Sequence, residues 1–267
     1  TRLRGCRRRG RLGRGPTAAL TNAPLSTQSA IFTDGDGLVL NYPRFYHLLR
    51  HFKPDFQKTL IIGGAGYNFP TDYLRKYPGK QIDVVEIDPQ MTALARRFFR
   101  LEDDPNLRIF HADGRVFLNR TQERYDAVLI DAFGSVYSVP FQLTTREAVG
   151  KMHDALTADG VLIMNLISSL EGEGSLFLQA ELATLREKFP QVFAFKVRGE
   201  RPDGEAQNVV LVASKADKIS FETNDEEIAN LLKNRYEKPP ELTVPVLTDD
   251  LAPVEHYNSL ALKYAEK

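Results

Sequence analysis

The 267-residue chain contains no tryptophan and only one cysteine, Cys6. A single cysteine excludes an internal disulfide and a thiolate metal site, and it favours a reducing, cytoplasmic compartment. No apolar run approaches the roughly 20 residues that cross a bilayer, and no apolar segment of the secretory type follows the N-terminal arginines. These absences, together with 42% hydrophobic residues, predict a soluble globular protein with a sizeable core.

The formal net charge is zero, because 35 basic residues balance 35 acidic ones. The distribution is uneven: residues 1–14 hold seven arginines and no acid, which leaves 28 basic against 35 acidic residues elsewhere. A Gly/Arg-rich stretch without apolar periodicity predicts a disordered tail. Such a tail can contact anionic lipid or nucleic acid, although a merely solvated tail is the simpler interpretation. Basic residues are otherwise scattered, so the folded body is not expected to bind nucleic acid.

What the sequence does contain is a regular alternation of strand and helix patterns. Strands are predicted at 59–62, 82–87, 107–111, 126–130, 161–166, 192–197 and 209–213, and helices at 71–77, 89–99, 144–156, 176–189 and 223–236. Strands that alternate with helices, and whose central members are continuous apolar runs, are typical of the α/β class. The pattern predicts a Rossmann-like, parallel-dominated sheet that is covered on both faces.

The remaining segments complete a four-part organisation. Two apolar runs, 29–32 and 38–41, flank a Gly/Asp turn and predict a small β-hairpin, and a short aromatic helix is expected over 43–52. We therefore expect a disordered Arg-rich tail over 1–20, a small N-terminal β-hairpin region over 21–52, a Rossmann-like domain over 53–222 and a C-terminal helical extension over 223–267.

Four consecutive strands of the predicted sheet end in residues suited to a binding site. They are Gly63-Gly64, Glu86, Asp113 with Gly114, and Asp131. In an open parallel sheet, ligands bind beyond the carboxyl ends of the strands, where the strand order reverses. The pattern therefore predicts one ligand site that these residues share, within the 53–222 domain.

The glycine turn favours one class of nucleoside ligand. Gly64 and Gly66 supply two glycines of a dinucleotide fingerprint, but Phe69 stands where the third would fall, which disfavours NAD. Glu86 follows Gly64 by 22 residues, the approximate spacing at which an acid accepts hydrogen bonds from a ribose diol. An S-adenosyl-type ligand is therefore expected at this turn.

Asp113 and Asp131 each have two interpretations. Asp113 is placed to accept a hydrogen bond from an adenine amino group, but it can equally cap the next helix. Asp131 ends a buried strand, where a carboxylate is costly unless it is paired or faces a cleft. It is the best candidate for catalysis, as an acceptor for a proton or for a cationic amine. The alternative is a structural hydrogen bond to a loop.

Other polar residues have structural explanations. Asp88 is expected to cap a helix that begins at Pro89, and Thr144 with Glu147 has capping-box spacing. The histidines show no metal-like spacing, so no metal site is expected. Tyr46 and its aromatic neighbours are expected to lie in the core, although Tyr46 could also line a cleft.

These residues, in this order, resemble the spermidine synthase family of polyamine aminopropyltransferases. The matching stretch runs from about residue 28 to residue 168, and Val85-Glu86-Ile87-Asp88 is its most suggestive single motif. The resemblance implies a fold of the S-adenosylmethionine-dependent methyltransferase type. It also implies a nucleoside site formed by Gln28, Gly63, Gly64, Gly66, Glu86, Asp113 and Gly114.

The family transfers an aminopropyl group from decarboxylated S-adenosylmethionine to a diamine such as putrescine. The resemblance therefore implies a transferase of polyamine biosynthesis that uses this co-substrate, a small polyamine and no metal. Asp131 would hold the attacking amine and take its proton, because a free alkylamine titrates near the lysine value of ~10.4. Tyr46 and His47 correspond to a tyrosine–histidine pair of the family and are expected on the substrate side.

Two positions depart from the family pattern. Gly66 and Gly134 stand where the family has carboxylates, the first of which binds the aminopropyl ammonium. We hypothesise that Asp249, Asp250 or Glu255 replaces the missing carboxylates on the substrate side. The alternative is that these acids cap the turn in which they lie.

Loop motifs such as Gly66-Tyr67-Asn68-Phe69-Pro70 and Thr248-Asp249-Asp250 resemble one bacterial branch of the family. In that branch the domain is often fused behind membrane helices. Because the chain begins with Thr1 rather than methionine, a soluble portion of such a fusion is one interpretation. A membrane-attached partner, a missing membrane segment and a homodimer all stay open.

Three functions follow from these observations. The first is a spermidine-synthase-like aminopropyltransferase, with Asp131 acting on the amine. The second is an S-adenosylmethionine-dependent methyltransferase, because a donor carboxylate would meet no negative charge at Gly66. The third is a non-catalytic nucleoside- or polyamine-sensing domain.

Overall fold

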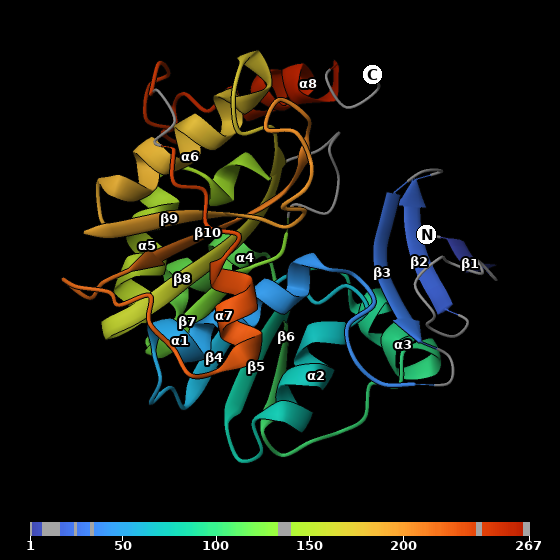
Figure 1. The fold of residues 1–267 in the computed structure, drawn as a ribbon. Coiled ribbons are helices and arrows are strands. Elements are labelled where there is room, and N and C mark those ends of the chain that lie inside the picture. Colours follow the sequence, from blue (N-terminus) through green and yellow to red (C-terminus); the bar gives the residue numbers. More distant parts are fainter. Residues whose placement is uncertain are drawn as a thin grey trace.

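The computed structural model describes residues 2–6, 17–23, 26–32, 35–132, 140–238 and 242–263. Its centre is a seven-stranded sheet with the strand order β6-β5-β4-β7-β8-β10-β9 (Figure 1). The strands are β4 (Lys58–Ile62), β5 (Gln81–Glu86), β6 (Leu107–His111), β7 (Tyr125–Ile130), β8 (Leu156–Ser168), β9 (Gln191–Lys196) and β10 (Gln207–Ser214). Strands β4 to β8 pair in parallel, whereas β10 is antiparallel to both β8 and β9. The predicted Rossmann-like, parallel-dominated sheet is confirmed.

Helices cover both faces of this sheet (Figure 1). They are η1 (Tyr42–Leu48), α1 (Leu49–Phe52), α2 (Asn68–Lys76), α3 (Pro89–Phe98), α4 (Gly114–Arg120), η2 (Phe141–Leu143), α5 (Arg146–Ala155), η3 (Glu173–Ser175), α6 (Leu176–Arg186), α7 (Glu226–Leu232) and α8 (Val254–Lys263). The helices predicted at 71–77, 89–99, 144–156 and 176–189 correspond to α2, α3, α5 and α6, whereas no range was predicted for α4. Helices α7 and α8 both lie within the range 223–267, for which a helical extension is expected. No helix among the described residues is long and apolar enough to span a bilayer.

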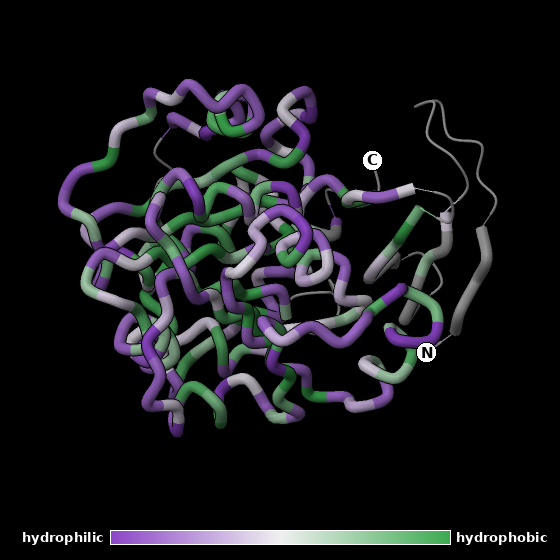
Figure 2. Tube along the Cα trace, turned by 90° about the horizontal axis from the view of Figure 1, so that it is seen from below, coloured by the Kyte–Doolittle hydropathy of each residue, from purple (hydrophilic) through white to green (hydrophobic). Residues whose placement is uncertain are grey.

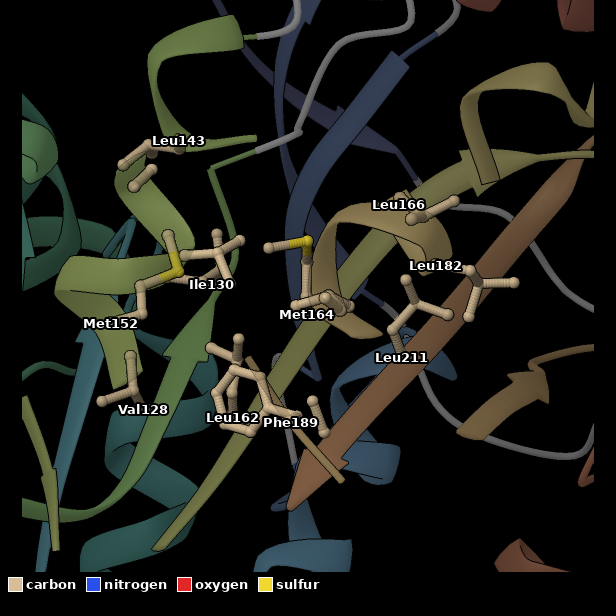
Figure 3. Close-up of a cluster of buried hydrophobic side chains, with 14 of the residues drawn as sticks. Val128, Ile130, Leu143, Met152, Leu162, Met164, Leu166, Leu182, Phe189 and Leu211 are labelled. Atoms are coloured by element: carbon tan, nitrogen blue, oxygen red, sulfur yellow. The ribbon is translucent and has the colours of Figure 1, made fainter. Parts of the chain in front are cut away.

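The two faces of the sheet bury two separate hydrophobic cores. Leu60 and Ile62 of β4 belong to one core with residues of α5 and α6, whereas Ile61 belongs to the other with residues of η1, α1 and α2. Figure 3 shows the first core, where Val128 on β7 lies near Met152 on α5. In Figure 2 the hydrophobic segments gather inside the body and the hydrophilic ones lie outside. Double-sided burial explains why the central strands are continuous apolar runs.

A small antiparallel sheet lies at one side of the body (Figure 1) and consists of β1 (Arg2–Cys6), β2 (Thr17–Ala23) and β3 (Ser26–Phe32). One prediction is wrong here: β3 pairs with β2 and not with residues 38–41, which form no strand because the chain there leads into η1. The disordered tail over 1–20 stays a prediction, since residues 1 and 7–16 lie outside the described residues, while 2–6 form β1 and 17–20 begin β2. Thr and Ala in β2 tolerate an extended ladder although they give little apolar signal.

Two N-terminal helix caps were predicted; the cap of α3 is confirmed and the cap of α5 is wrong. Asp88 caps α3 by accepting a hydrogen bond from the backbone N–H of its first turn at 2.9 Å, which confirms the prediction. The cap of α5 is Thr145, which accepts from the N–H of Ala148 at 3.3 Å. The prediction of Thr144 is wrong by one residue, because its hydroxyl donates instead to the carbonyl of Phe141 at 2.7 Å.

Candidate active site

Two adjoining cavities open at the carboxyl ends of the central strands. β4 lies between β5 and β7, so the strand order reverses at this point. We call them the Glu86 cavity, lined among others by Glu86, Asp113, Gly114 and Leu143, and the Asn68 cavity, lined among others by Ser29, Gly64, Asn68 and Phe69. Tyr42, Gly63, Ala65 and Asp131 line both. The space open to a water molecule is about 210 Å³ in the first cavity and about 20 Å³ in the second.

Gly63 allows the ends of β4 and β7 to lie against each other. Its φ is +100°, a left-handed conformation that favours glycine. A Cβ atom at Gly63 would lie only 2.5 Å from the carbonyl oxygen of Asp131. The backbone N–H of Asp131 in turn donates to the carbonyl of Ile62 at 2.9 Å. The glycine is therefore required to bring Asp131 beside the turn.

Gly63→Ala is expected to cost about 3 kcal/mol of unfolding free energy or more, because strain and a backbone clash act together. Gly79→Ala is the matched control, since Gly79 also has a positive φ of +82° but open space around its Cβ position. The control is expected to lose only about 1–2 kcal/mol. Urea unfolding measures both, and equal losses would contradict the close approach at Asp131.

Glu86 is held by the glycine turn itself. Its Oε2 accepts from the backbone N–H of Gly64 at 2.8 Å and of Ala65 at 2.9 Å, and its Oε1 accepts from Asp88 at 2.9 Å. The side chain is buried, yet it lines the Glu86 cavity. Oε2 already accepts two bonds, so Oε1 is the oxygen that keeps an acceptor site free. The arrangement presents a fixed acceptor that suits a ligand hydroxyl.

The far wall of the Glu86 cavity combines an acid with an apolar surface. Asp113 caps α4, because its Oδ1 accepts from the N–H of Val116 at 2.9 Å. The structural alternative for Asp113 is therefore observed, while a contact with adenine stays a prediction. Ile87 lies 69% exposed beside Met91 and Leu143 on the lining. An exposed apolar side chain there is suited to pack against a flat base.

Asp131 lies at the junction of the two cavities. The Tyr42 hydroxyl donates to its Oδ2 at 3.3 Å. The residue is only partly covered, because it faces both cavities, yet it lies deep among protein atoms. This burial raises the pKa of Asp131 to about 7, although Tyr46 and Tyr42 act in the opposite direction. A carboxyl group with that pKa can exchange a proton near neutral pH.

Tyr46 stands behind Asp131 and is fully buried. Its hydroxyl is near enough to lower the pKa of Asp131, but it makes no hydrogen bond of regular geometry among the described residues. Burial, followed by the charge of Asp131, raises the pKa of both Tyr42 and Tyr46 well above 10. Both phenols therefore stay protonated and offer hydrogens toward the carboxylate.

His47 points away from the cavities even though it is the neighbour of Tyr46. Its Nε2 lies 2.9 Å from Oδ2 of Asp72, and its Nδ1 lies 2.8 Å from the Tyr77 hydroxyl. Burial lowers the pKa of His47. The residue joins η1 to α2 and is not among the described residues that line either cavity. Its contact with substrate stays a prediction that this geometry does not favour.

The space around Gly66 is filled by other residues. A Cβ at Gly66 would lie 2.6 Å from Cβ of Ser29 and 2.7 Å from Oδ1 of Asn68. Ser29, on β3, also accepts a hydrogen bond from the N–H of Gly66 at 2.9 Å. Gln28 precedes Ser29 on β3, but its side chain lies outside the described part of the structure, as does all of Gly134. The small sheet thus closes the corner where the resemblance implies a carboxylate.

Asp249 and Asp250 are not brought into the site. Asp249 pairs with Arg115 at 2.7 Å and accepts from the Thr145 hydroxyl at 2.6 Å, which ties the C-terminal segment to α4 and α5. Asp250 is exposed. Neither acid is among the described residues that line the cavities. A substrate role for these acids stays a prediction, and the structure gives Asp249 a bridging role instead.

Sequence reasoning missed three residues of the site: Ser29, Tyr42 and Asn68. Tyr42, the first residue of η1, is 89 residues away from Asp131 in the chain, and Ser29 on β3 is 37 residues away from Gly66. These approaches join residues that are far apart in the chain, so spacing could not reveal them. No cluster of three or more potential metal ligands occurs among the residues that the structure describes.

Comparison with known proteins places these observations in context. Residues 44–198 match the family described as the spermine/spermidine synthase domain. A polyamine aminopropyltransferase of Vibrio vulnificus is 34% identical over 152 residues, which cover 56% of this chain and 49% of the relative. An eEF1A lysine and N-terminal methyltransferase of Xenopus laevis is 27% identical over 196 residues, 70% of this chain and 27% of the relative. The chain spans about half the length of the curated aminopropyltransferases it matches.

The fold also has solved counterparts. The crystal structure of a probable spermidine synthase from Corynebacterium glutamicum superposes with a TM-score of 0.70 at 20% identity, over 87% of this chain and 82% of that one. At this identity the likeness supports the fold alone. The matched family region includes Tyr46, the glycine turn, Glu86, Asp113 and Asp131.

Proposed function

The chain belongs to the spermine/spermidine synthase family, and we propose that it transfers an aminopropyl group from decarboxylated S-adenosylmethionine to a small amine such as putrescine. One observation carries the proposal. Asp131, whose pKa is raised to about 7, stands where a cavity suited to a nucleoside meets a second cavity. A proton acceptor at that junction is what transfer between two substrates requires.

The donor is proposed to bind in the Glu86 cavity. Glu86 would accept a hydrogen bond from a ribose hydroxyl, since three backbone N–H groups already fix its carboxylate. Ile87 and Leu143 would pack on the adenine, and Asp113 would receive its amino group. Gly63 and Gly64 let the donor lie close to the backbone. This placement sets the sulfonium end of the donor toward Asp131.

In the proposed reaction, the amine nitrogen attacks the carbon next to the sulfonium. A carbon–nitrogen bond forms, the carbon–sulfur bond breaks, and its electron pair leaves on sulfur as neutral methylthioadenosine. The attacking nitrogen must be neutral, so its surplus proton passes to Asp131. The hydroxyl of Tyr42, 3.3 Å from Oδ2, would hold the carboxylate in place. Fixing both substrates against each other supplies much of the remaining acceleration.

The rate constant kcat/KM is expected to fall as the pH drops below about 7, because Asp131 must be ionised to take the proton. Tyr42→Phe removes a hydroxyl that lowers the pKa of Asp131, so it should move this acidic limb to higher pH. Tyr73→Phe is the control, since the Tyr73 hydroxyl bonds Thr59 and Gln81 instead. The prediction fails if the acidic limbs of the pH–rate profiles of the wild-type protein and Tyr42→Phe coincide.

Product analysis tests the proposal. The protein is incubated with decarboxylated S-adenosylmethionine and putrescine, and separately with S-adenosylmethionine and a panel of amine acceptors. Spermidine and methylthioadenosine in equal amounts are the expected products of the first reaction. S-Adenosylhomocysteine from the second reaction alone would overturn the proposal in favour of methyl transfer. Binding of nucleosides without either product would indicate a sensing domain.

Methyl transfer is the second candidate, and two observations favour it. One is the similarity to a methyltransferase of Xenopus laevis over 70% of the chain. The other is residue 66 itself, because Ser29 and Asn68 leave no room there for a carboxylate side chain. A donor that keeps its own carboxylate would therefore meet no acidic side chain from residue 66.

A further inference from the structure

Arg115 contacts the backbone of one wall of the Glu86 cavity, and the proposed reaction gives it no role. Gln142 and Leu143 of η2 belong to that wall, as does Gly114, the residue before Arg115. A Cβ at Gly114 would lie 3.7 Å from Cδ1 of Leu143, so η2 lies against the start of α4. Nη1 of Arg115 donates to the carbonyl oxygen of Gln142 at 3.1 Å. The guanidinium therefore holds η2 by its backbone.

The guanidinium is itself fixed by two further partners. Nη2 donates to Oδ2 of Asp249 at 2.7 Å, and Nη1 also donates to Oγ1 of Thr145 at 3.2 Å. The Thr145 hydroxyl donates in turn to Oδ1 of Asp249 at 2.6 Å. The Arg115 side chain is only 15% exposed. A planar guanidinium with several partners has little freedom left, so it is suited to act as a fixed support.

The C-terminal segment that carries Asp249 is bound to two helices of the body. The carbonyl of Leu247 accepts from the backbone N–H of Arg146 on α5 at 2.9 Å, and its own N–H donates to Oγ1 of Thr184 on α6 at 3.0 Å. The backbone N–H of Asp249 donates to Oε2 of Glu147 at 3.0 Å. The carboxylate that holds the guanidinium is therefore anchored to α5 and α6.

We propose that Arg115 is a positioning residue for the donor's nucleoside, and that it fixes the η2 wall of the Glu86 cavity through the Gln142 carbonyl. The inference rests on the proposed function, which places the nucleoside in this cavity. A wall that is in place before the ligand arrives spares the ligand the cost of ordering it. Removal of the support therefore weakens nucleoside binding, while the chemistry at Asp131 is unchanged.

The proposal gives Asp249 an effect on the donor and none on the acceptor amine. An acid that bound the acceptor directly would raise the KM of putrescine when it is removed. An acid that acts through Arg115 raises the KM of the donor instead. The substrate whose KM changes therefore distinguishes the two roles of Asp249.

Substitutions of both members of the ion pair test the inference. Arg115→Met should weaken methylthioadenosine by about 3–10-fold and raise the KM of decarboxylated S-adenosylmethionine by a similar factor, because the hydrogen bonds to η2 are lost. The value of kcat and the KM of putrescine should stay within about 2-fold, as expected when only ground-state binding is lost. Asp249→Ala should produce a smaller change of the same kind. The double variant should bind methylthioadenosine as Arg115→Met alone does, because the two residues act through one contact.

Two further variants serve as the control and as a safeguard against misfolding. Arg146→Met is the matched control, because Arg146 begins α5 beside Thr145 but pairs with Glu187, and neither residue of that pair is among the described residues that line the cavity. It should leave nucleoside affinity and both KM values unchanged. Arg115→Lys keeps a positive charge beside Asp249, but one ammonium nitrogen cannot span all the acceptors of the guanidinium, so it should weaken methylthioadenosine by about 2–5-fold.

Calorimetric titration with methylthioadenosine and initial-rate kinetics give the comparison. The inference is overturned if Arg115→Met and Arg115→Lys bind methylthioadenosine as tightly as Arg146→Met does, or if Asp249→Ala raises the KM of putrescine and not that of the donor. Spermidine formation without the nucleoside shift would overturn the role of Arg115 and leave aminopropyl transfer standing. The nucleoside shift without spermidine formation would support Arg115 and overturn the transfer.

Discussion

Asp131→Asn is expected to reduce aminopropyl transfer by about 10²–10⁴-fold, the usual contribution of a general base. The amide has nearly the same shape as the carboxyl and can still accept from Tyr42, but it cannot take a proton from the amine. The nucleoside is held at Glu86, so the affinity for methylthioadenosine should not change. The variant is assayed for spermidine formation and titrated with methylthioadenosine.

The same substitution should stabilise the protein above pH 7. The pKa of Asp131 rises from 3.8 to about 7 on folding, so the folded state binds the proton more tightly than the unfolded state. Wild-type stability therefore falls as the pH rises from about 4 to about 7. A shift of this size corresponds to at most ~4 kcal/mol, and water in the cavities reduces it. We expect Asp131→Asn to gain about 1–3 kcal/mol at pH 8 in urea unfolding and nothing near pH 4.

Asp83→Asn is the matched control for both effects. Asp83 is fully buried on β5, where Arg108 donates to it at 2.8 Å and Tyr125 at 2.8 Å. The same chemical change there removes an ion pair, so it should destabilise the protein and leave the chemistry intact. If Asp131→Asn is also destabilised at pH 8 and retains activity, Asp131 is a structural hydrogen-bonding residue and the proposed mechanism is wrong.

Glu86→Gln is expected to weaken methylthioadenosine binding by about 10–100-fold, because charge-assisted hydrogen bonds contribute about 1.5–3 kcal/mol. The amide also places its NH₂ group against at least one of the backbone N–H groups that now donate to the carboxylate. Both effects remove the fixed acceptor that a ribose hydroxyl would use. Calorimetry with methylthioadenosine measures the loss directly.

Asp88→Asn serves as the control for that measurement. Asp88 lies two residues beyond Glu86 and caps α3, a task that asparagine performs about as well. Neither stability nor nucleoside affinity should change appreciably. An unaltered affinity in Glu86→Gln would show that the ribose is held elsewhere, and the Glu86 cavity would lose its assigned ligand.

Residues at strand ends could be predicted from the sequence because their positions depend on local patterns. Glu86 follows the glycine turn at a fixed spacing, and Asp131 ends an apolar run whose burial on both faces requires a parallel sheet. The same reasoning identified Asp88 as a cap. These residues are placed by the regular geometry of strands and helices, which the sequence encodes within short windows.

Residues that depend on long-range packing could not be predicted. Ser29 meets Gly66 only because β3 pairs with β2 and lies against the glycine turn, a pairing that the weak apolar signal of β2 did not reveal. His47 follows Tyr46 in sequence, but successive helical residues point in different directions, and His47 faces Asp72. Of these two neighbours in the sequence, Tyr46 lies toward Asp131 and His47 does not.

A competition experiment tests the central claim most directly. Wild-type protein receives equal concentrations of decarboxylated S-adenosylmethionine and S-adenosylmethionine together with putrescine, and the modified acceptor is identified by mass spectrometry. The account predicts that putrescine gains an aminopropyl group, that methylthioadenosine accumulates with it, and that Asp131→Asn abolishes both. A methylated acceptor with S-adenosylhomocysteine, formed while the decarboxylated donor stays intact, would contradict it.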